Sequence, residues 1–194
     1  MTFKRKIYDK FLEWKRNSDG KTALLVEGAR RIGKSTIVEE FAKNEYESYI
    51  LIDFTKASKE VLNLFDDISD LNYIFMRLQL IYHKELHERK SLIIFDEVQF
   101  CPKARQAIKH LVADHRYDYI ETGSLISIRK NVKDILIPSE ERTVQMYPMD
   151  YEEFKWALGD TVTIKLLRES FEKYQPLGDD LNRTMMRDFR LYML

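Results

Sequence analysis

Residues Gly28 to Thr36 have the types and the spacing of a phosphate-binding loop, because they match the pattern G-x-x-x-x-G-K-S. Glycines at both ends of this pattern allow a tight turn in which successive backbone N–H groups point inward at an anion. Lys34 can reach the β- and γ-phosphates of a nucleotide, and the hydroxyl of Ser35 can bind Mg²⁺. The stretch therefore predicts a nucleotide-phosphate site, with contacts from Gly28, Ala29, Arg30, Arg31, Ile32, Gly33, Lys34, Ser35 and Thr36.

Two carboxylates, Asp96 and Glu97, follow a second apolar run that begins at Ser91. At the tip of a buried strand, Asp96 can accept hydrogen bonds from the waters around Mg²⁺. Glu97 can orient and deprotonate the water that attacks the terminal phosphate. The pair predicts ATP hydrolysis rather than nucleotide binding alone, and a surface carboxylate is the alternative interpretation of Glu97.

A third polar stretch, Thr122-Gly123-Ser124, follows a strand-like run at 117–121. In P-loop ATPases with an additional strand, a polar residue at this place contacts the γ-phosphate or the attacking water. Thr122 and Ser124 are therefore predicted to act with Lys34 and Glu97 in catalysis. Alternatively, Ser124 caps a helix, a position to which serine is equally suited.

Four other polar residues have two interpretations each. Asp53 ends an apolar run and lies either at the ligand-binding edge of a sheet or in a cap of the next turn. Arg142 either enters near the same edge and adds positive charge to the phosphates or, as we favour, forms a salt bridge within the domain. His83 and His87, four residues apart on a predicted helix, form either a metal pair or, as we favour, two exposed polar groups, because no glutamate or third ligand accompanies them.

Alternating strand and helix patterns surround these motifs and predict an α/β fold. The first segment, residues 3–17, has apolar residues at helical spacing. This amphipathic helix either caps the sheet edge or, through Ile7 and Tyr8, forms an apolar slot for the nucleotide base. We expect strands at 22–26, 49–54, 91–97, 117–121 and 142–149, helices at 37–42, 58–65, 71–88, 102–112 and 151–157, a loop with a weak strand at 129–137, and two helices within 161–194.

The composition limits the classes of partner. Of 194 residues, 32 are Lys or Arg and 32 are Asp or Glu, so the net charge is zero and no overall field attracts nucleic acid or an anionic membrane. Nucleic acid is a possible partner, although the net charge gives no support for binding it. One cysteine, Cys101, excludes an internal disulfide and favours a reducing compartment. Since no apolar run approaches the ~20 residues that span a bilayer, we expect no membrane partner and a cytoplasmic location.

These motifs together resemble those of prokaryotic P-loop ATPases of the AAA+ superfamily in which the ATPase domain is fused to a C-terminal domain of unknown function. Arg31, Leu125 and Glu121 depart from the pattern, in which Gln and Ser are common at the first two positions and Glu is unexpected at the third. The resemblance covers nearly all of the chain and runs through Arg5-Lys6-Ile7-Tyr8, Trp14-Lys15, 24–31, Asp96-Glu97-Val98-Gln99, Thr122-Gly123-Ser124 and 147–154.

The resemblance implies a three-layer sandwich with a parallel sheet in the order 5-1-4-3-2 and nucleotide at the carboxyl ends of the strands. We expect an N-terminal helix at 1–20, an ATPase core at 21–158 and a helical extension at 159–194 that leads to an absent C-terminal domain, because the chain stops on apolar residues without a helix cap. The expected activity is Mg²⁺-dependent ATP hydrolysis, slow in isolation, coupled to that domain or to a protein partner. The alternative is an ATP-gated binding switch with little turnover.

Overall fold

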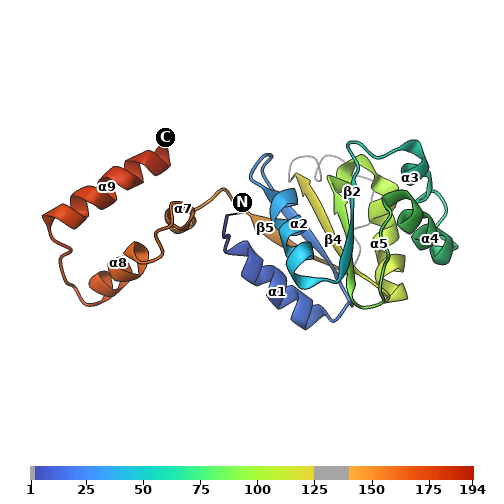
Figure 1. The fold of residues 1–194 in the computed structure, drawn as a ribbon, viewed down its shortest axis with the longest axis horizontal. Helices are drawn as coiled ribbons and strands as arrows, with labels where there is room; N and C mark the ends of the chain where they lie inside the picture. Colours follow the sequence, from blue (N-terminus) through green and yellow to red (C-terminus); the bar gives the residue numbers. More distant parts are fainter. Residues whose placement is uncertain (1–2, 125–139) are drawn as a thin grey trace. The chain divides into compact units, whose positions relative to one another are not determined.

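The computed structural model describes residues 3–124 and 140–194. The chain folds into two compact units (Figure 1). One unit contains Ile7–Tyr147, and the other combines the residues up to Lys6 with Pro148–Leu194. The weak strand expected at 129–137 lies outside the described residues, and so does Leu125.

A parallel sheet of five strands forms the centre of the larger unit, in the order β2-β3-β4-β1-β5. This is the predicted order 5-1-4-3-2 read from the other edge. Strands β3 and β4 are buried along their whole length, as expected of parallel strands with helices on both faces. The strands are β1 (Ala23–Gly28), β2 (Ser48–Asp53), β3 (Ser91–Asp96), β4 (Asp118–Ser124) and β5 (Glu141–Met146).

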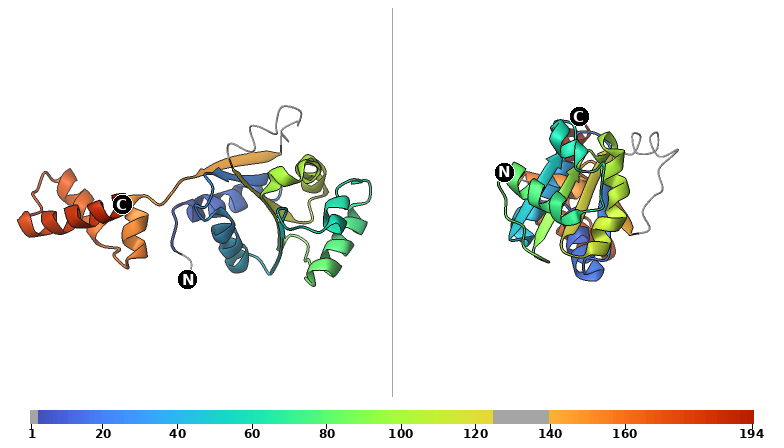
Figure 2. Two further views of the ribbon diagram at one scale, coloured as in Figure 1. Left: turned by 90° about the horizontal axis from the view of Figure 1, so that it is seen from above. Right: turned by 90° about the vertical axis from the view of Figure 1, so that its right-hand side faces the viewer.

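Helices cover both faces of this sheet and create two apolar cores. On one face, α1 and α2 pack on alternate residues of the strands, with Phe11, Phe41 and Ile94 fully buried between them. On the other face, α3, α4 and α5 cover the remaining strand residues, such as Leu25 and Ile93 (Figure 1, Figure 2). The helices are α1 (Ile7–Ser18), α2 (Lys34–Glu45), α3 (Lys59–Asn63), α4 (Leu71–Tyr82), the short 3₁₀ helix η1 (Val98–Phe100) and α5 (Pro102–Asp114).

The helix expected at 71–88 is shorter than the sequence predicts. It ends at Tyr82 because His83 adopts a left-handed conformation with φ 51°, and Gln79 accepts a hydrogen bond of 2.8 Å from the N–H of Leu86 instead. His83 and His87 therefore do not share a helical face, which removes the basis of the metal-pair interpretation. In residues 3–124 and 140–194, no group of three or more His, Cys, Asp or Glu side chains could hold a metal ion.

A buried charged cluster interrupts the apolar core on the α5 face of the sheet. Arg105 on α5 forms an ion pair with Glu141 on β5, with Nη2 and Oε1 3.2 Å apart. The carboxyl of Glu121 on β4 is fully buried and lies next to that of Glu141. Among the described residues, no donor forms a hydrogen bond to either oxygen of Glu121. One cation therefore faces two carboxyl groups.

The smaller unit contains three helices, α7 (Tyr151–Ala157), α8 (Thr163–Glu172) and α9 (Asp179–Met193). Asp150 and Glu153 form a capping box at the start of α7. Glu153 also forms a buried ion pair with Arg5, at 3.2 Å, and this pair ties the N-terminal residues to α7. Lys155 on α7 bridges to Asp188 on α9 at 2.7 Å. Throughout the part of the chain that the structure describes, no helix is long and apolar enough to cross a membrane.

Candidate active site

The predicted phosphate loop connects the end of β1 to the start of α2. Arg31 and Gly33 have φ angles of 64° and 89°, so the loop turns twice through the left-handed region. A Cβ on Gly28 would lie 2.3 Å from the carbonyl oxygen of Met146, which explains why the last residue of β1 is glycine. No side chain among the described residues caps α2, so its first N–H groups are available to an anion.

Lys34 is the first residue of α2, and its side chain is buried against the loop. Its Nζ donates hydrogen bonds to the carbonyl oxygens of Ala29, at 2.7 Å, and of Gly28, at 3.2 Å. Burial lowers the pKa of Lys34 below its ordinary value, and the nearby carboxylates of Glu97 and Asp96 oppose this shift. The ammonium group is therefore positioned between the loop and the two predicted acidic residues.

Asp96 at the tip of β3 connects the loop to β4. Its Oδ1 accepts a hydrogen bond of 2.6 Å from the hydroxyl of Ser35 and a second one from the hydroxyl of Thr122. The two predicted metal ligands, Ser35 and Asp96, are thus in direct contact. A hydroxyl and a carboxylate are oxygen ligands of the kind that Mg²⁺ prefers, so these residues fit the ion that the motif implies.

Thr122 and Ser124 occupy different positions at the end of β4. Thr122 is fully buried, and besides donating to Asp96 its Oγ1 accepts a hydrogen bond of 3.1 Å from the backbone N–H of Glu97. The hydroxyl of Thr122 therefore links the two acidic residues. Ser124 is paired with Gly28 in the register of β1 and β4, which places it beside the first residue of the phosphate loop.

Sequence reasoning missed Gln99 as a part of this site. Its side-chain amide donates a hydrogen bond to Oε2 of Glu97 from two residues away, across the first turn of η1. The one feature of the sequence that points to Gln99 is the stretch Asp96-Glu97-Val98-Gln99, in which a polar residue follows Glu97 two positions later. Nothing in that spacing reveals that the chain folds back.

The model of a family described as AAA domain matches residues 20–155, which include every residue of this site. The chain belongs to the AAA domain family. Among solved structures, the Aeropyrum pernix ORC1 protein in complex with DNA has a TM-score of 0.51 and 11% sequence identity. The match covers 80% of this chain and 48% of that one, so the chain spans about half the length of the archaeal protein. At this identity the similarity shows the fold alone, and no curated protein matches the chain.

Arg142, one of the weaker candidates, lies away from the phosphate loop of this AAA domain. Arg142 pairs with Leu24 at the beginning of β1, whereas Gly28 pairs with Met146. At about 3.3 Å per residue, four residues separate Arg142 from the phosphate edge by roughly 13 Å. The expectation that it adds charge to the phosphates is wrong, because β1 and β5 run parallel. Arg142 is exposed, and the described residues form no ion pair with it, so the salt bridge that we favoured is not found either.

Ile7 and Tyr8 pack into the core of the AAA domain. Ile7 is buried among the apolar residues of α1 and α2. The hydroxyl of Tyr8 donates to Glu45 at 3.0 Å, and Glu45 is the last residue of α2. Because Lys34 begins this helix, Glu45 lies about 16 Å along it from the phosphate loop. These contacts argue against the base slot and favour the alternative, in which this helix packs on the sheet.

Asp53 and Cys101 have structural roles in this AAA domain. Asp53 accepts hydrogen bonds from the N–H and hydroxyl of Thr55 and forms an ion pair with Lys56 at 3.1 Å. Asp53 therefore caps the turn after β2, which is the second of the two interpretations given for it. Cys101 is buried, and burial raises the pKa of its thiol.

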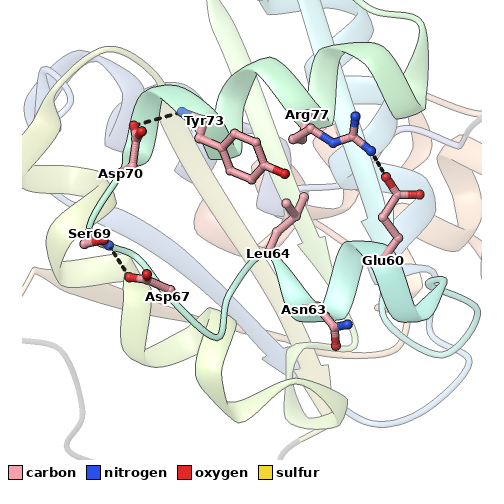
Figure 3. Close-up of a pocket in the computed structure, with 8 residues that line it drawn as sticks. All are labelled: Glu60, Asn63, Leu64, Asp67, Ser69, Asp70, Tyr73 and Arg77. Carbon is pink, nitrogen blue, oxygen red and sulfur yellow. Dashed lines mark hydrogen bonds and ion pairs between the residues drawn. The ribbon is translucent and has the colours of Figure 1, made fainter.

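A surface pocket between α3 and α4 is separate from the phosphate loop (Figure 3). Arg77 reaches from α4 to Glu60 on α3, while Asp67 and Asp70 accept hydrogen bonds from backbone N–H groups. The acidic groups in this pocket are therefore used by the local fold. The lining consists of Glu60, Asn63, Leu64, Asp67, Ser69, Asp70, Tyr73 and Arg77.

Proposed function

We propose that this chain binds Mg²⁺ and ATP at residues 28–36 and hydrolyses the ATP, with Glu97 as the general base. The observation that supports this proposal is a continuous hydrogen-bonded chain through Ser35, Asp96 and Thr122 to the backbone of Glu97. It brings three distant segments together at the carboxyl edge of the sheet, where nucleotides bind in open α/β folds. The AAA domain match favours the same class of activity.

Each residue has a distinct task in this proposal. Loop amides and Lys34 hold the phosphates, and Ser35 and Asp96 supply oxygen ligands for Mg²⁺. When bound, Mg²⁺ neutralises charge on the phosphates. Glu97 orients the attacking water and takes its proton. We assign Ser124 to contact with the γ-phosphate, since its strand register places it beside Gly28.

Two substitutions test the site and the reaction separately. Lys34→Ala should abolish the stabilisation by Mg²⁺ and ATP in thermal unfolding, which is about 4 kcal/mol for a ligand at a thousand times its Kd. Glu97→Gln should retain that stabilisation and lose phosphate release. An undiminished shift in Lys34→Ala contradicts the site, whereas equal phosphate release by wild type and Glu97→Gln indicates an ATP-gated switch instead.

We further propose that the ATPase output passes to a protein partner or to a C-terminal domain. The proposed organisation is an N-terminal helix at 1–20, an ATPase core at 21–158 and a helical extension at 159–194. We expect slow turnover by the chain alone, because arginine supplied in trans accelerates other NTPases by ~10³ to 10⁵. One cysteine in the sequence favours the cytoplasm. Phosphate release with and without DNA tests whether nucleic acid is involved.

A further inference from the structure

Glu97 is held in an unusual backbone conformation. Its φ and ψ angles are 54° and 49°, in the left-handed region that residues with a side chain rarely adopt. Two backbone hydrogen bonds maintain this conformation. The N–H donates to Thr122, and the carbonyl oxygen accepts a bond of 3.0 Å from the N–H of Phe100. Strained residues of this kind concentrate at functional sites, where the surrounding structure fixes them.

Gln99 fixes the side chain of the same residue. It is 7% exposed and lies in the middle of η1, directly after Val98, which is fully buried in the core. The short helix therefore leaves Gln99 little freedom to move. From this position its Nε2 donates a hydrogen bond to Oε2 of Glu97. One carboxylate oxygen is thus held, and the other is left to accept a proton.

We propose that Gln99 is a positioning residue that orients the carboxylate of Glu97 toward the attacking water. The inference rests on the proposed function and adds to it the group that aims the base. An amide suits this role because it donates a hydrogen bond without carrying charge. A lysine or arginine at the same place would pair with Glu97 and stabilise its ionised form, which weakens a base. An aspartate or glutamate at position 99 would repel the carboxylate of Glu97.

The test uses Gln99→Met, which nearly preserves side-chain length and removes the donor. Gln106→Met is the matched control, because Gln106 is exposed on α5. Binding of a fluorescent ATP analogue and single-turnover phosphate release are measured for both variants and for wild type. We expect Gln99→Met to release phosphate at least about tenfold more slowly with unchanged nucleotide affinity, since a misdirected base loses part of its contribution. Gln106→Met should match wild type in both measurements.

The double variant Glu97→Gln with Gln99→Met separates positioning from a general structural role. If Gln99 acts only through Glu97, the double variant releases phosphate no more slowly than Glu97→Gln alone. A further loss in the double variant, or a wild-type rate in Gln99→Met, overturns the inference and leaves the proposed function intact. If wild type and Glu97→Gln release phosphate equally, the proposed function fails and the inference fails with it.

Discussion

Replacing Glu121 with glutamine should stabilise the protein, and the gain should increase with pH. The carboxyl of Glu121 is fully buried beside Glu141, which is already paired with Arg105. Burial raises the pKa of Glu121 well above its ordinary range, the Glu141 carboxylate raises it further, and Arg105 opposes the rise. In the folded protein Glu121 therefore keeps its proton, and its O–H can donate to Glu141.

The sign of the effect follows from proton binding. In the unfolded chain Glu121 loses its proton near pH ~4.3, whereas the folded protein retains it to higher pH. Between these two pKa values the unfolded state binds fewer protons, so the free energy of unfolding falls by about 1.4 kcal/mol per pH unit. From about pH 5 to about pH 7 the loss amounts to ~2.7 kcal/mol if the folded protein keeps the proton throughout. Glutamine has the same shape, retains a donor and does not ionise.

Urea unfolding at a series of pH values, monitored by circular dichroism, measures this difference. The free energy of unfolding of Glu121→Gln should exceed that of wild type by an amount that grows with pH across this interval. Glu13→Gln is the matched control, because Glu13 is exposed on α1 and should leave the wild-type pH dependence unchanged. Parallel curves for wild type and Glu121→Gln would refute the reasoning, since they would mean that Glu121 titrates alike in both states.

Three further substitutions test the packing of the site and of the smaller unit. Thr122→Val keeps the shape but leaves a backbone N–H unpaired, so phosphate release should fall more than nucleotide affinity, with ~1–3 kcal/mol of stability lost in urea unfolding. Gly28→Ala should reduce the free energy of unfolding by ~1–3 kcal/mol and so lower the Tm, because its Cβ would lie 2.3 Å from the carbonyl oxygen of Met146. Glu153→Gln should reduce the free energy of unfolding by ~3 kcal/mol, because it neutralises one side of the buried ion pair with Arg5. Unfolding of the smaller unit is followed by the fluorescence of Trp156.

Residue types and their local spacing predict the class of the fold and the main parts of the site. The glycines around Lys34 and the apolar runs before Gly28 and Asp96 have local causes, namely backbone freedom and burial on both faces of a strand. The strand order came with the family resemblance, and the structure confirms it. Such features are readable because each depends on residues adjacent in the chain.

Which side chains meet depends on how separate elements pack in the folded protein. The parallel register of β1 and β5 places Arg142 at the edge opposite the phosphate loop. The hydroxyl of Thr122 contacts two acidic residues of β3 and its following turn, and Gln99 folds back onto Glu97. The charged neighbours of Glu121, Glu141 and Arg105, come from two other elements. Spacing along the chain does not predict these contacts, because register and packing between separate elements determine them.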